Sequence, residues 1–320
     1  MERIVGMIIT ENSKENLIKV AVVGDVHDQW EEADGLALKQ LGVDLVLFVG
    51  DLGNESVPVV RQIAGLDIPK AVILGNHDGW YTATDWGRSK CPYNRETEDW
   101  LQEQLDLLGD THVGYGKLDF PKLGLSVVGS RPFSWGGPVW KYADFYRRFG
   151  VSGFETSARR IVAAARRTSY ETVIFLGHNG PTGLGDLPED PCGKDWKPIG
   201  GDYGDPDFQE AIMETQAMGK QVCLVAFGHM HHNLRHTGVR LRRATHLDQL
   251  GTVYLNAARV PRIIKTQTEC RRNFSIVTLC GGVVAEITLV WVADNLGVVS
   301  SEVLYGGSGA VVGAGFGESY

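Results

Sequence analysis

Five short apolar segments of this 320-residue chain each end in glycine, followed by side chains that can bind metal ions. These candidate ligands are Asp25, His27, Asp51, Asn76, His178, His229 and His231. The Asp-x-His and His-x-His spacings place two ligands on the same side of an extended segment. Mixed carboxylate, imidazole and amide ligands suit Mn²⁺, Fe or Zn²⁺ better than Ca²⁺ or Mg²⁺. Two such ions, roughly 3.5–4 Å apart, can clamp a phosphate and generate hydroxide, so the set predicts two-metal phosphoester chemistry.

Each of these residues also has an ordinary structural interpretation. Alone, Asp25 could cap a helix, and Asn76 and Asp78 could form a turn. A lone His178 is more often a hydrogen-bonded loop residue, and the histidines at 229, 231 and 232 could form an exposed tract. Five independent turns would not explain why every such residue follows a buried strand. The joint pattern therefore favours one metal site.

The candidate ligands follow segments that read as buried strands. Val/Ile/Leu-rich runs occupy residues 18–24, 44–50, 70–75, 124–129, 171–177 and 221–228. Helical patterns occupy residues 30–41, 56–66, 97–108 and 154–167. This alternation predicts a mainly parallel sheet covered by helices. The carboxyl ends of parallel strands meet at one edge, so the ligands are expected to converge there.

After His236 the pattern changes to strands without intervening helices. Residues 239–243, 252–256, 273–280 and 283–292 read as strands, with Gly281-Gly282 as a two-residue hairpin turn. We expect a largely antiparallel block, and hence a sheet sandwich with outer helices. Residues 79–124 and 179–206 are expected to form long excursions above the strand ends. The expected organisation is an extension over 1–17, one domain over 18–304 and a disordered Gly-rich tail over 305–320.

Composition narrows the expected partners and location. The chain has a formal net charge of −8, whereas nucleic-acid-binding proteins are generally basic. A nucleic-acid partner is therefore not expected. Five cysteines without a Cys-x-x-Cys pair favour a reducing compartment. The apolar run at 283–292 is too short to span a bilayer, and the N-terminal run is too short for a signal peptide. We expect a soluble cytoplasmic protein with no membrane partner.

The ordered motifs resemble the calcineurin-like metallophosphoesterase superfamily. The motifs are Asp-x-His at 25, Gly-Asp at 50, Gly-Asn-His-Asp at 75, Gly-His at 177 and Gly-His-x-His at 228. The resemblance implies an α/β fold with two mixed sheets flanked by helices, a four-layer αββα sandwich. It also implies two divalent ions, with Mn expected and Fe or Zn as alternatives.

The resemblance also implies a division of labour among the residues. One ion would be held by the set Asp25, His27, Asp51 and His231. The other would be held by the set Asp51, Asn76, His178 and His229, with Asp51 bridging. His77 matches the family histidine that contacts the phosphate and protonates the leaving oxygen. The implied activity is phosphoester hydrolysis by metal-activated hydroxide, with Asp51 and His77 as catalytic residues.

Departures from the family pattern bear on the substrate. Serine/threonine phosphatases continue the second motif as Gly-Asp-x-x-Asp-Arg-Gly, whereas Asn54 replaces the second acid here and the arginine is missing. Their third motif ends in Glu, whereas this one ends in Asp78. The segment 254–262 resembles the DevT-like metallophosphoesterases of cyanobacteria and plants, whose representative member is regarded as a protein phosphatase. This implies a phosphomonoesterase, with a phosphorylated protein as one possible substrate.

Substrate contacts are expected from Asn54, Arg131 and Arg259. Arg131 follows a strand and could grip phosphate bidentately, or it could lie on the surface over Trp135. The alternative substrates are nucleotides or other small molecules, cleaved by a phosphatase or phosphodiesterase. Aromatic residues could wall a pocket for them: Trp80, Tyr81, Trp86, Trp135, Trp140, Trp196 and Tyr203. A non-catalytic, metal-stabilised scaffold is the third alternative, although a scaffold has no need of a proton donor such as His77.

Overall fold

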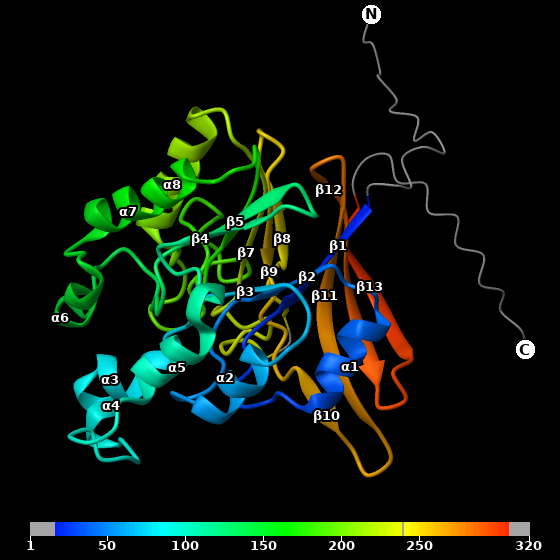
Figure 1. Ribbon diagram of the computed structural model, residues 1–320, viewed down its shortest axis with the longest axis horizontal. Coiled ribbons are helices and arrows are strands. Elements are labelled where there is room, and N and C mark those ends of the chain that lie inside the picture. Colours follow the sequence, from blue (N-terminus) through cyan, green and yellow to red (C-terminus); the bar gives the residue numbers. More distant parts are fainter. Residues whose placement is uncertain (1–16, 239, 307–320) are drawn as a thin grey trace, which may run out of the picture.

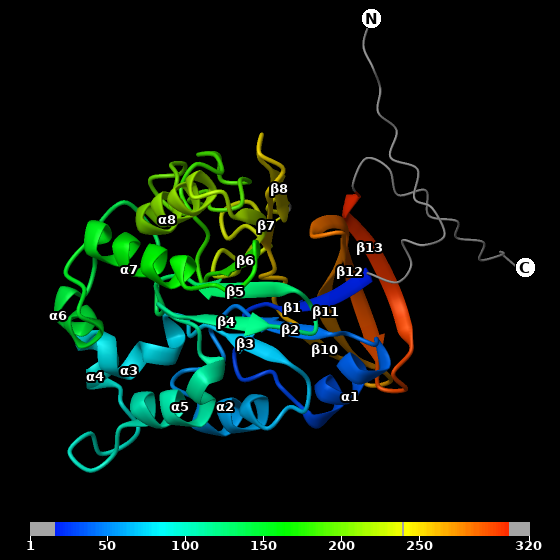
Figure 2. The same ribbon diagram turned by 45° about the horizontal axis from the view of Figure 1, so that its top comes forward.

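Two β-sheets lie face to face in the middle of the molecule, and helices cover their outer faces (Figures 1 and 2). This computed structural model describes residues 17–238 and 240–306. The arrangement is the predicted four-layer αββα sandwich, and that prediction is confirmed.

The first sheet joins both ends of the described chain. Its strand order is β13-β12-β11-β1-β2-β3, and β10 pairs with β11. Strands β1 to β3 are parallel, whereas β11 is antiparallel to β1, β10 and β12, and β13 is antiparallel to β12. The bounds are β1 (Leu17–Val23), β2 (Leu45–Phe48), β3 (Lys70–Val72), β10 (Ile263–Lys265), β11 (Cys270–Cys280), β12 (Val283–Ala293) and β13 (Val298–Gly306).

The second sheet has the order β4-β5-β6-β7-β9-β8. Strands β5, β6, β7 and β9 are parallel, and β4 and β8 are antiparallel edge strands. The bounds are β4 (Lys117–Phe120), β5 (Leu125–Gly129), β6 (Thr172–Leu176), β7 (Gln221–Phe227), β8 (Thr245–Leu247) and β9 (Val253–Asn256).

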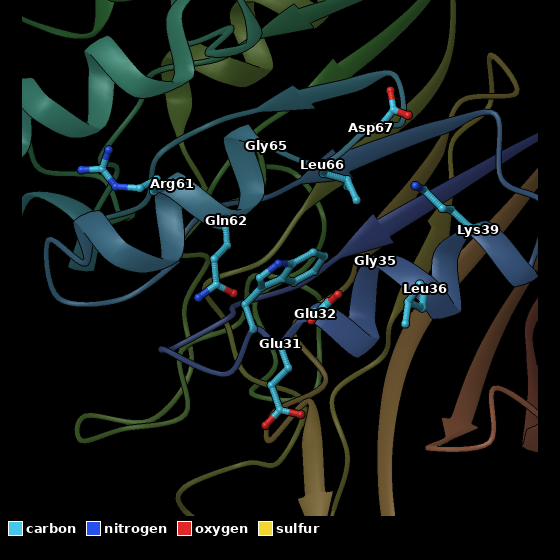
Figure 3. Close-up of a pocket in the computed structure, with 11 residues that line it drawn as sticks. Glu31, Glu32, Gly35, Leu36, Lys39, Arg61, Gln62, Gly65, Leu66 and Asp67 are labelled. Carbon is cyan, nitrogen blue, oxygen red and sulfur yellow. The ribbon is translucent and has the colours of Figure 1, made fainter.

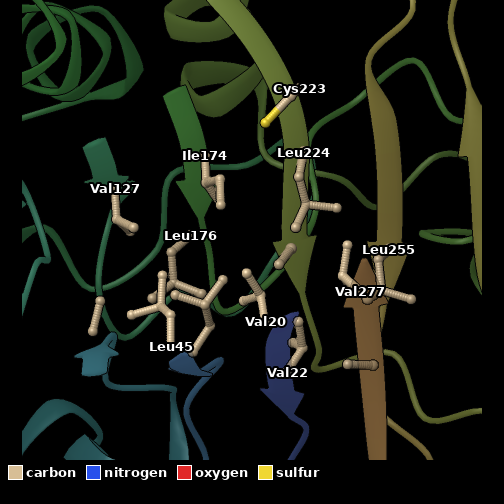
Figure 4. Packing of buried hydrophobic residues seen from close by; sticks show 14 of the residues in the cluster. Val20, Val22, Leu45, Val127, Ile174, Leu176, Cys223, Leu224, Leu255 and Val277 are labelled. Carbon is tan, nitrogen blue, oxygen red and sulfur yellow. The ribbon is translucent and has the colours of Figure 1, made fainter. Parts of the chain in front are cut away.

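Alternation along the strands produces the layers. On β1, Val20 and Val22 point between the sheets, while Ala21 and Val23 pack under helices. The inter-sheet core includes Leu45, Ile174 and Leu224 (Figure 4). Continuous apolar runs thus reflect strands that are buried on both faces.

Helices on the two outer faces come from different halves of the chain. α1 (Glu32–Gln40), α2 (Val57–Ala64) and α5 (Trp100–Leu108) contribute to the core on the first sheet. α7 (Phe154–Arg166) and α8 (Pro206–Ala217) pack on the second. Two short helices lie in the first excursion, α3 (Trp80–Ala83) and α4 (Asp85–Ser89), and a third, α6 (Ala143–Tyr146), lies between β5 and α7. No helix within 17–238 and 240–306 has both the length and the apolarity needed to cross a membrane.

The second half of the chain differs from the prediction in two ways. No strand spans the described part of 239–243, where Leu241 forms an isolated bridge with Asn233. Arg242 is buried there and donates to the carbonyl oxygens of Pro188, Asp190 and Gly193, so loop contacts replace a sheet ladder. The antiparallel block is also divided, because β9 runs parallel to β7 in the second sheet.

The expected terminal segments fall almost entirely outside the described residues. Of the extension over 1–17, only Leu17 is described, and it begins β1. Of the tail over 305–320, Tyr305 and Gly306 are described, and they end β13 rather than forming disordered chain. The antiparallel hairpin predicted at Gly281-Gly282 is present between β11 and β12.

Candidate metal centre

Loops at the carboxyl ends of strands in both sheets carry the candidate metal ligands. Asp25 and His27 follow β1, Asp51 follows β2, and Asn76 follows β3. The loops after β6 and β7 supply the ligands at positions 178, 229 and 231. Backbone bonds join these loops, since His27 N–H donates to Asp51 O at 2.8 Å and Gly228 N–H donates to His178 O at 2.7 Å. All seven predicted ligands therefore lie together across the two sheets.

Three of these ligands adopt backbone conformations that non-glycine residues rarely take. The φ angles are +46° at His27, +51° at Asp51 and +66° at His229. Left-handed backbone at such residues is uncommon and costs on the order of 1–3 kcal/mol each. Strain that is concentrated at three potential ligands points to a functional site.

Two glycines allow the loops to approach closely. A Cβ on Gly75 would lie 2.4 Å from Asp51 Oδ1, and one on Gly228 would lie 2.2 Å from Asp25 Oδ1. Side chains at either position would push a carboxylate out of place. The glycines that end the apolar runs are therefore needed for the carboxylates to reach the site.

One group of ligand atoms joins Asp25, His27 and His231. His231 Nε2 lies 3.1 Å from Asp25 Oδ2 and 3.1 Å from His27 Nε2. The backbone N–H of His229 donates to both oxygens of Asp25, at 3.0 and 3.1 Å. Asp25 is buried and is fixed from the second sheet.

A second group joins Asp51, Asn76, His178 and His229. His178 Nε2 lies 2.9 Å from Asn76 Oδ1, 3.2 Å from Asp51 Oδ1 and 3.2 Å from His229 Nδ1. The other oxygen of Asp51, Oδ2, lies 3.9 Å from His27 Nε2. Asp51 therefore lies between the two groups.

The donor set fits a cation in chemical terms. His178 Nδ1 lies 2.8 Å from the carbonyl oxygen of Val49, so Nδ1 carries the proton and Nε2 presents a lone pair. That lone pair faces oxygens of Asn76 and Asp51 that have no proton to share with it when Asp51 is ionised. A metal ion satisfies such a cluster of acceptors, and the fixed Nδ1–H is the usual support for a metal-binding histidine.

The charge states also suit metal binding. Burial raises the pKa of Asp25, but the hydrogen bond and charge of His231 outweigh it and hold the pKa below its ordinary value. Burial lowers the pKa of His229 well below 6.5, and neighbouring His178 lowers it further. Both shifts favour the unprotonated forms that bind metals.

His77 lies beside this cluster with its ring orientation fixed. Its backbone N–H donates to Asp51 Oδ1 at 2.9 Å. Its Nδ1 lies 2.6 Å from Asn54 Oδ1, and the amide oxygen can only accept, so Nδ1 carries a proton. His77 Nε2 lies 4.0 Å from Asp51 Oδ2. Asn54, expected as a substrate contact, therefore orients the catalytic candidate.

Two acids that were not predicted as site residues anchor the loop that follows β2. Asp78 is buried and accepts N–H bonds from Leu52, Gly53 and Gly75 at 2.8, 3.2 and 2.7 Å. Glu55 accepts from Thr82 N–H at 2.7 Å and from the Tyr93 hydroxyl at 2.6 Å. These contacts were not readable from the sequence, where Asp78 resembles a simple turn former.

A column of aromatic rings extends from His77. Trp80 stacks on His77 with ring centroids 4.7 Å apart and planes 13° apart. Trp135 also stacks with Trp80, with ring centroids 5.3 Å apart, and Tyr142 tilts against Trp135 at 5.2 Å. The Trp80 indole therefore supports the His77 ring and limits its rotation.

Replacing Trp80 with leucine is expected to lower kcat about 10-fold, because the His77 ring loses its flat support. The loss should be greater for an alkyl phosphate than for p-nitrophenyl phosphate, since the better leaving group needs less protonation. Trp80→Phe keeps a flat ring and should retain most activity. Equal losses for both substrates would contradict a role in positioning His77.

The ligand cluster opens into a cavity of about 430 Å³. Its walls include Trp80, Trp135, Trp196 and Tyr203, and Lys141 also lines it. A larger groove of about 710 Å³ lies between α1 and α2, with Leu36 and Leu66 among its side chains (Figure 3). That groove contains none of the candidate ligands, so the smaller cavity is the candidate active site.

Arg131 does not reach the cavity, contrary to its expected role as a phosphate contact. Its guanidinium is buried and donates to Asp207 at 2.9 Å and to Asp205 at 2.7 Å. The ring centroids of Trp140, Tyr146 and Phe154 lie 5.0–5.5 Å from its Cζ. The two carboxylates occupy the fork that would have gripped phosphate.

Removing this buried cation should destabilise the fold. We expect Arg131→Met to lower the free energy of unfolding by about 3–5 kcal/mol, because Asp205 and Asp207 are left buried without their partner. Urea unfolding would measure the change, with the exposed Arg159→Met as control. A loss equal to that of the control would show that the pair contributes little.

Arg259, the other expected phosphate contact, is half-buried and is not among the residues that line the cavity. Its backbone carbonyl accepts a bond from the Asn273 side chain at 3.1 Å. Nearby, Asn256 donates to Met230 O at 2.8 Å and Pro191 O at 3.0 Å. This segment therefore supports the last ligand loop rather than reaching over it.

Comparison with known proteins finds one family model that matches this chain. The model of a family described as calcineurin-like phosphoesterase matches residues 18–233. No curated protein matches the chain. Protein TT1561 of Thermus thermophilus is similar at 11% identity, over 90% of this chain and 100% of that one, with a TM-score of 0.47.

Two further solved structures are similar to the chain. A purple acid phosphatase, PPD1, from yellow lupin (Lupinus luteus) seeds is 14% identical over 90% of this chain and 53% of its own, with a TM-score of 0.39. A novel archaeal phosphodiesterase is 10% identical over 82% of this chain and 99% of its own, with a TM-score of 0.35.

Proposed function

The chain belongs to the calcineurin-like phosphoesterase family, and on this premise we propose that it is a metal-dependent phosphomonoesterase. The observation that carries the proposal is the convergence of seven ligand-type side chains in two groups, with Asp51 between them and His77 beside them. A scaffold would need the ligands but not an oriented histidine that faces the same cavity.

Two divalent ions would be held by the two groups described above. Asp25, His27 and His231 would hold one with Asp51, while Asn76, His178 and His229 would hold the other with the same carboxylate. When bound, the ions supply Lewis-acid stabilisation of phosphoryl charge and lower the pKa of water. We propose Mn²⁺, with Fe or Zn²⁺ as alternatives, since all suit mixed nitrogen and oxygen ligands.

The chain's own side chains position the reaction. Asn54 holds the Nδ1–H of His77, which leaves Nε2 to act at the cavity. His77 in its protonated form would donate a proton from Nε2 to the leaving oxygen. Asp78 keeps the loops of Asp51 and His77 in fixed relation. The aromatic rings that line the cavity would limit the access of water to the reacting groups.

We also propose that the chain is a member of the DevT-like subgroup, on the resemblance of segment 254–262. That resemblance favours a monoester and places a phosphorylated protein among the candidate substrates. The alternative is a nucleotide or another small phosphoester. Trp80 already stacks with His77 and Trp135, so less of its ring surface is left for a base or sugar than the sequence suggested.

A substrate panel tests the proposed activity. The purified protein, loaded separately with Mn²⁺, Fe²⁺ and Zn²⁺, would be assayed with p-nitrophenyl phosphate, its bis ester, phosphopeptides and nucleotides. We expect turnover of the monoester, its loss on chelation and its recovery when the metal is restored. Turnover of the bis ester alone would contradict the monoesterase, and no turnover with any metal would favour the scaffold.

A further inference from the structure

A half-buried lysine faces the candidate active site without a carboxylate partner. Lys141 lines the cavity that contains Asp51, Asn76 and His77. Its ammonium lies 3.5 Å from Trp135 O and 3.3 Å from Gly136 O, and 5.2 Å from the centroid of the Tyr203 ring. These distances give weak or bent contacts, so the charge is only partly compensated.

The other charges of the cavity do not neutralise Lys141. Asp195 accepts the backbone N–H of Arg235 at 2.9 Å and lies 3.6 Å from Arg242 Nη2. The guanidinium of Arg242 donates hydrogen bonds to four backbone carbonyl oxygens. Within 17–238 and 240–306, Lys141 and the exposed Arg235 are therefore the cavity cations whose side chains form no ion pair with a carboxylate.

Lys141 is held in a fixed place rather than on a free loop. Gly137 N–H donates to Tyr203 O at 2.8 Å, and the Asn179 side chain donates to the same oxygen at 2.9 Å. Asn179 directly follows the ligand His178. The loop that presents Lys141 is thus tied to the metal-ligand loop. Burial lowers the pKa of Lys141, and the charge of Asp205 offsets this effect only in part.

We propose that Lys141 binds a second anionic group, a carboxylate or a further phosphate, on the organic part of a small phosphomonoester. This inference rests on the proposed function, because it places the scissile phosphate at the ligand cluster near Asp51 and His77. The cavity of about 430 Å³ has the size of a small-molecule site. Arg131, which could have gripped phosphate according to the sequence, is not available to an anion here, because Asp205 and Asp207 neutralise it.

Matched substrates test the assignment. The ratio of kcat/KM would be measured for 4-carboxyphenyl phosphate and for hydroquinone bisphosphate, each against phenyl phosphate. The wild type should prefer one or both of the substrates with a second anion. Lys141→Met should reduce that preference about 10- to 100-fold, the range for a hydrogen bond to a charged group. The substrate whose kcat/KM ratio falls more in the variant identifies the second anion as a carboxylate or a phosphate.

Controls separate the possible failures. Lys141→Arg should keep most of the preference, and Lys122→Met removes an exposed lysine far from the cavity. Lys141→Gln is a second neutral variant should Lys141→Met not fold. No turnover of phenyl phosphate by the wild type would overturn the proposed function itself. Turnover with the same preference in wild type and Lys141→Met would overturn only the inference. A Lys141-dependent preference for acidic phosphopeptides over all three small substrates would overturn the small-molecule class.

Discussion

Replacing Asp51 with asparagine is expected to remove both metal ions and to lower kcat/KM by about 10³-fold or more. Its two carboxylate oxygens face different ligand groups, Oδ1 at 3.2 Å from His178 and Oδ2 at 3.9 Å from His27. An amide cannot supply two anionic oxygens, and the Lewis-acid stabilisation that is lost amounts to several kcal/mol. Metal content per chain and kcat/KM measured on the same preparation would check this.

The matched control is Asp144→Asn, which removes an exposed carboxylate on α6. It should leave metal content and activity unchanged. If Asp51→Asn retained two metals per chain, the carboxylate would not join the two groups. Retention of one metal would assign Asp51 to a single group.

The second large effect is expected for His77→Gln, which should keep both metals but lower kcat by roughly 10²–10⁴-fold. The side chain of His77 belongs to neither ligand group as we have assigned them, while its backbone N–H bond to Asp51 is retained. Loss of a proton donor should be most severe for substrates with poor leaving groups. A plot of log kcat against the leaving-group pKa should therefore become steeper.

His246→Gln serves as the control, since His246 is exposed on edge strand β8. Its kinetic constants should match the wild type. Metal loss in His77→Gln would instead make His77 a ligand. Its ring nitrogen is close enough to Asp51 and His27 for that outcome to be a serious test.

The strands that carry the site could be predicted because each is a run of apolar residues and each run ends at a glycine. Residues 20–23 and 222–227 are all buried, so their apolar runs are unbroken, and each run stops at a glycine. The ligands were predictable for a related reason. Their chemical types are distinctive, and their positions follow directly from the strand ends.

Elements that depend on weaker patterns were missed. β13 has six consecutive exposed residues from Val298 to Val303, so it shows no alternation. α8 offered a readable signal, since Pro206 precedes buried residues at 208, 211, 212 and 215. The preceding Gly- and Pro-rich segment obscured that boundary.

The contacts that support the site could not be predicted from the sequence, for a different reason. Asp78, Trp80 and Lys141 act through partners that are distant in the chain or through shared access to one cavity. Arg131 was predicted as a phosphate contact for the same reason, because the carboxylates that neutralise it lie more than 70 residues away in the chain. Residue type and local spacing predict what a side chain can do, whereas its partners decide whether it is free to do it.

The origin of the ligands in both sheets has a mechanical consequence. Asp25, Asp51 and Asn76 extend from the first sheet, whereas the histidines at 178, 229 and 231 extend from the second. A slip of one sheet over the other by a single strand residue, about 3.3 Å, would separate atoms that now lie 2.9–3.2 Å apart. The geometry of the metal centre thus depends on the relative position of the two sheets. Changes that shift one sheet against the other should therefore lower the affinity for metal.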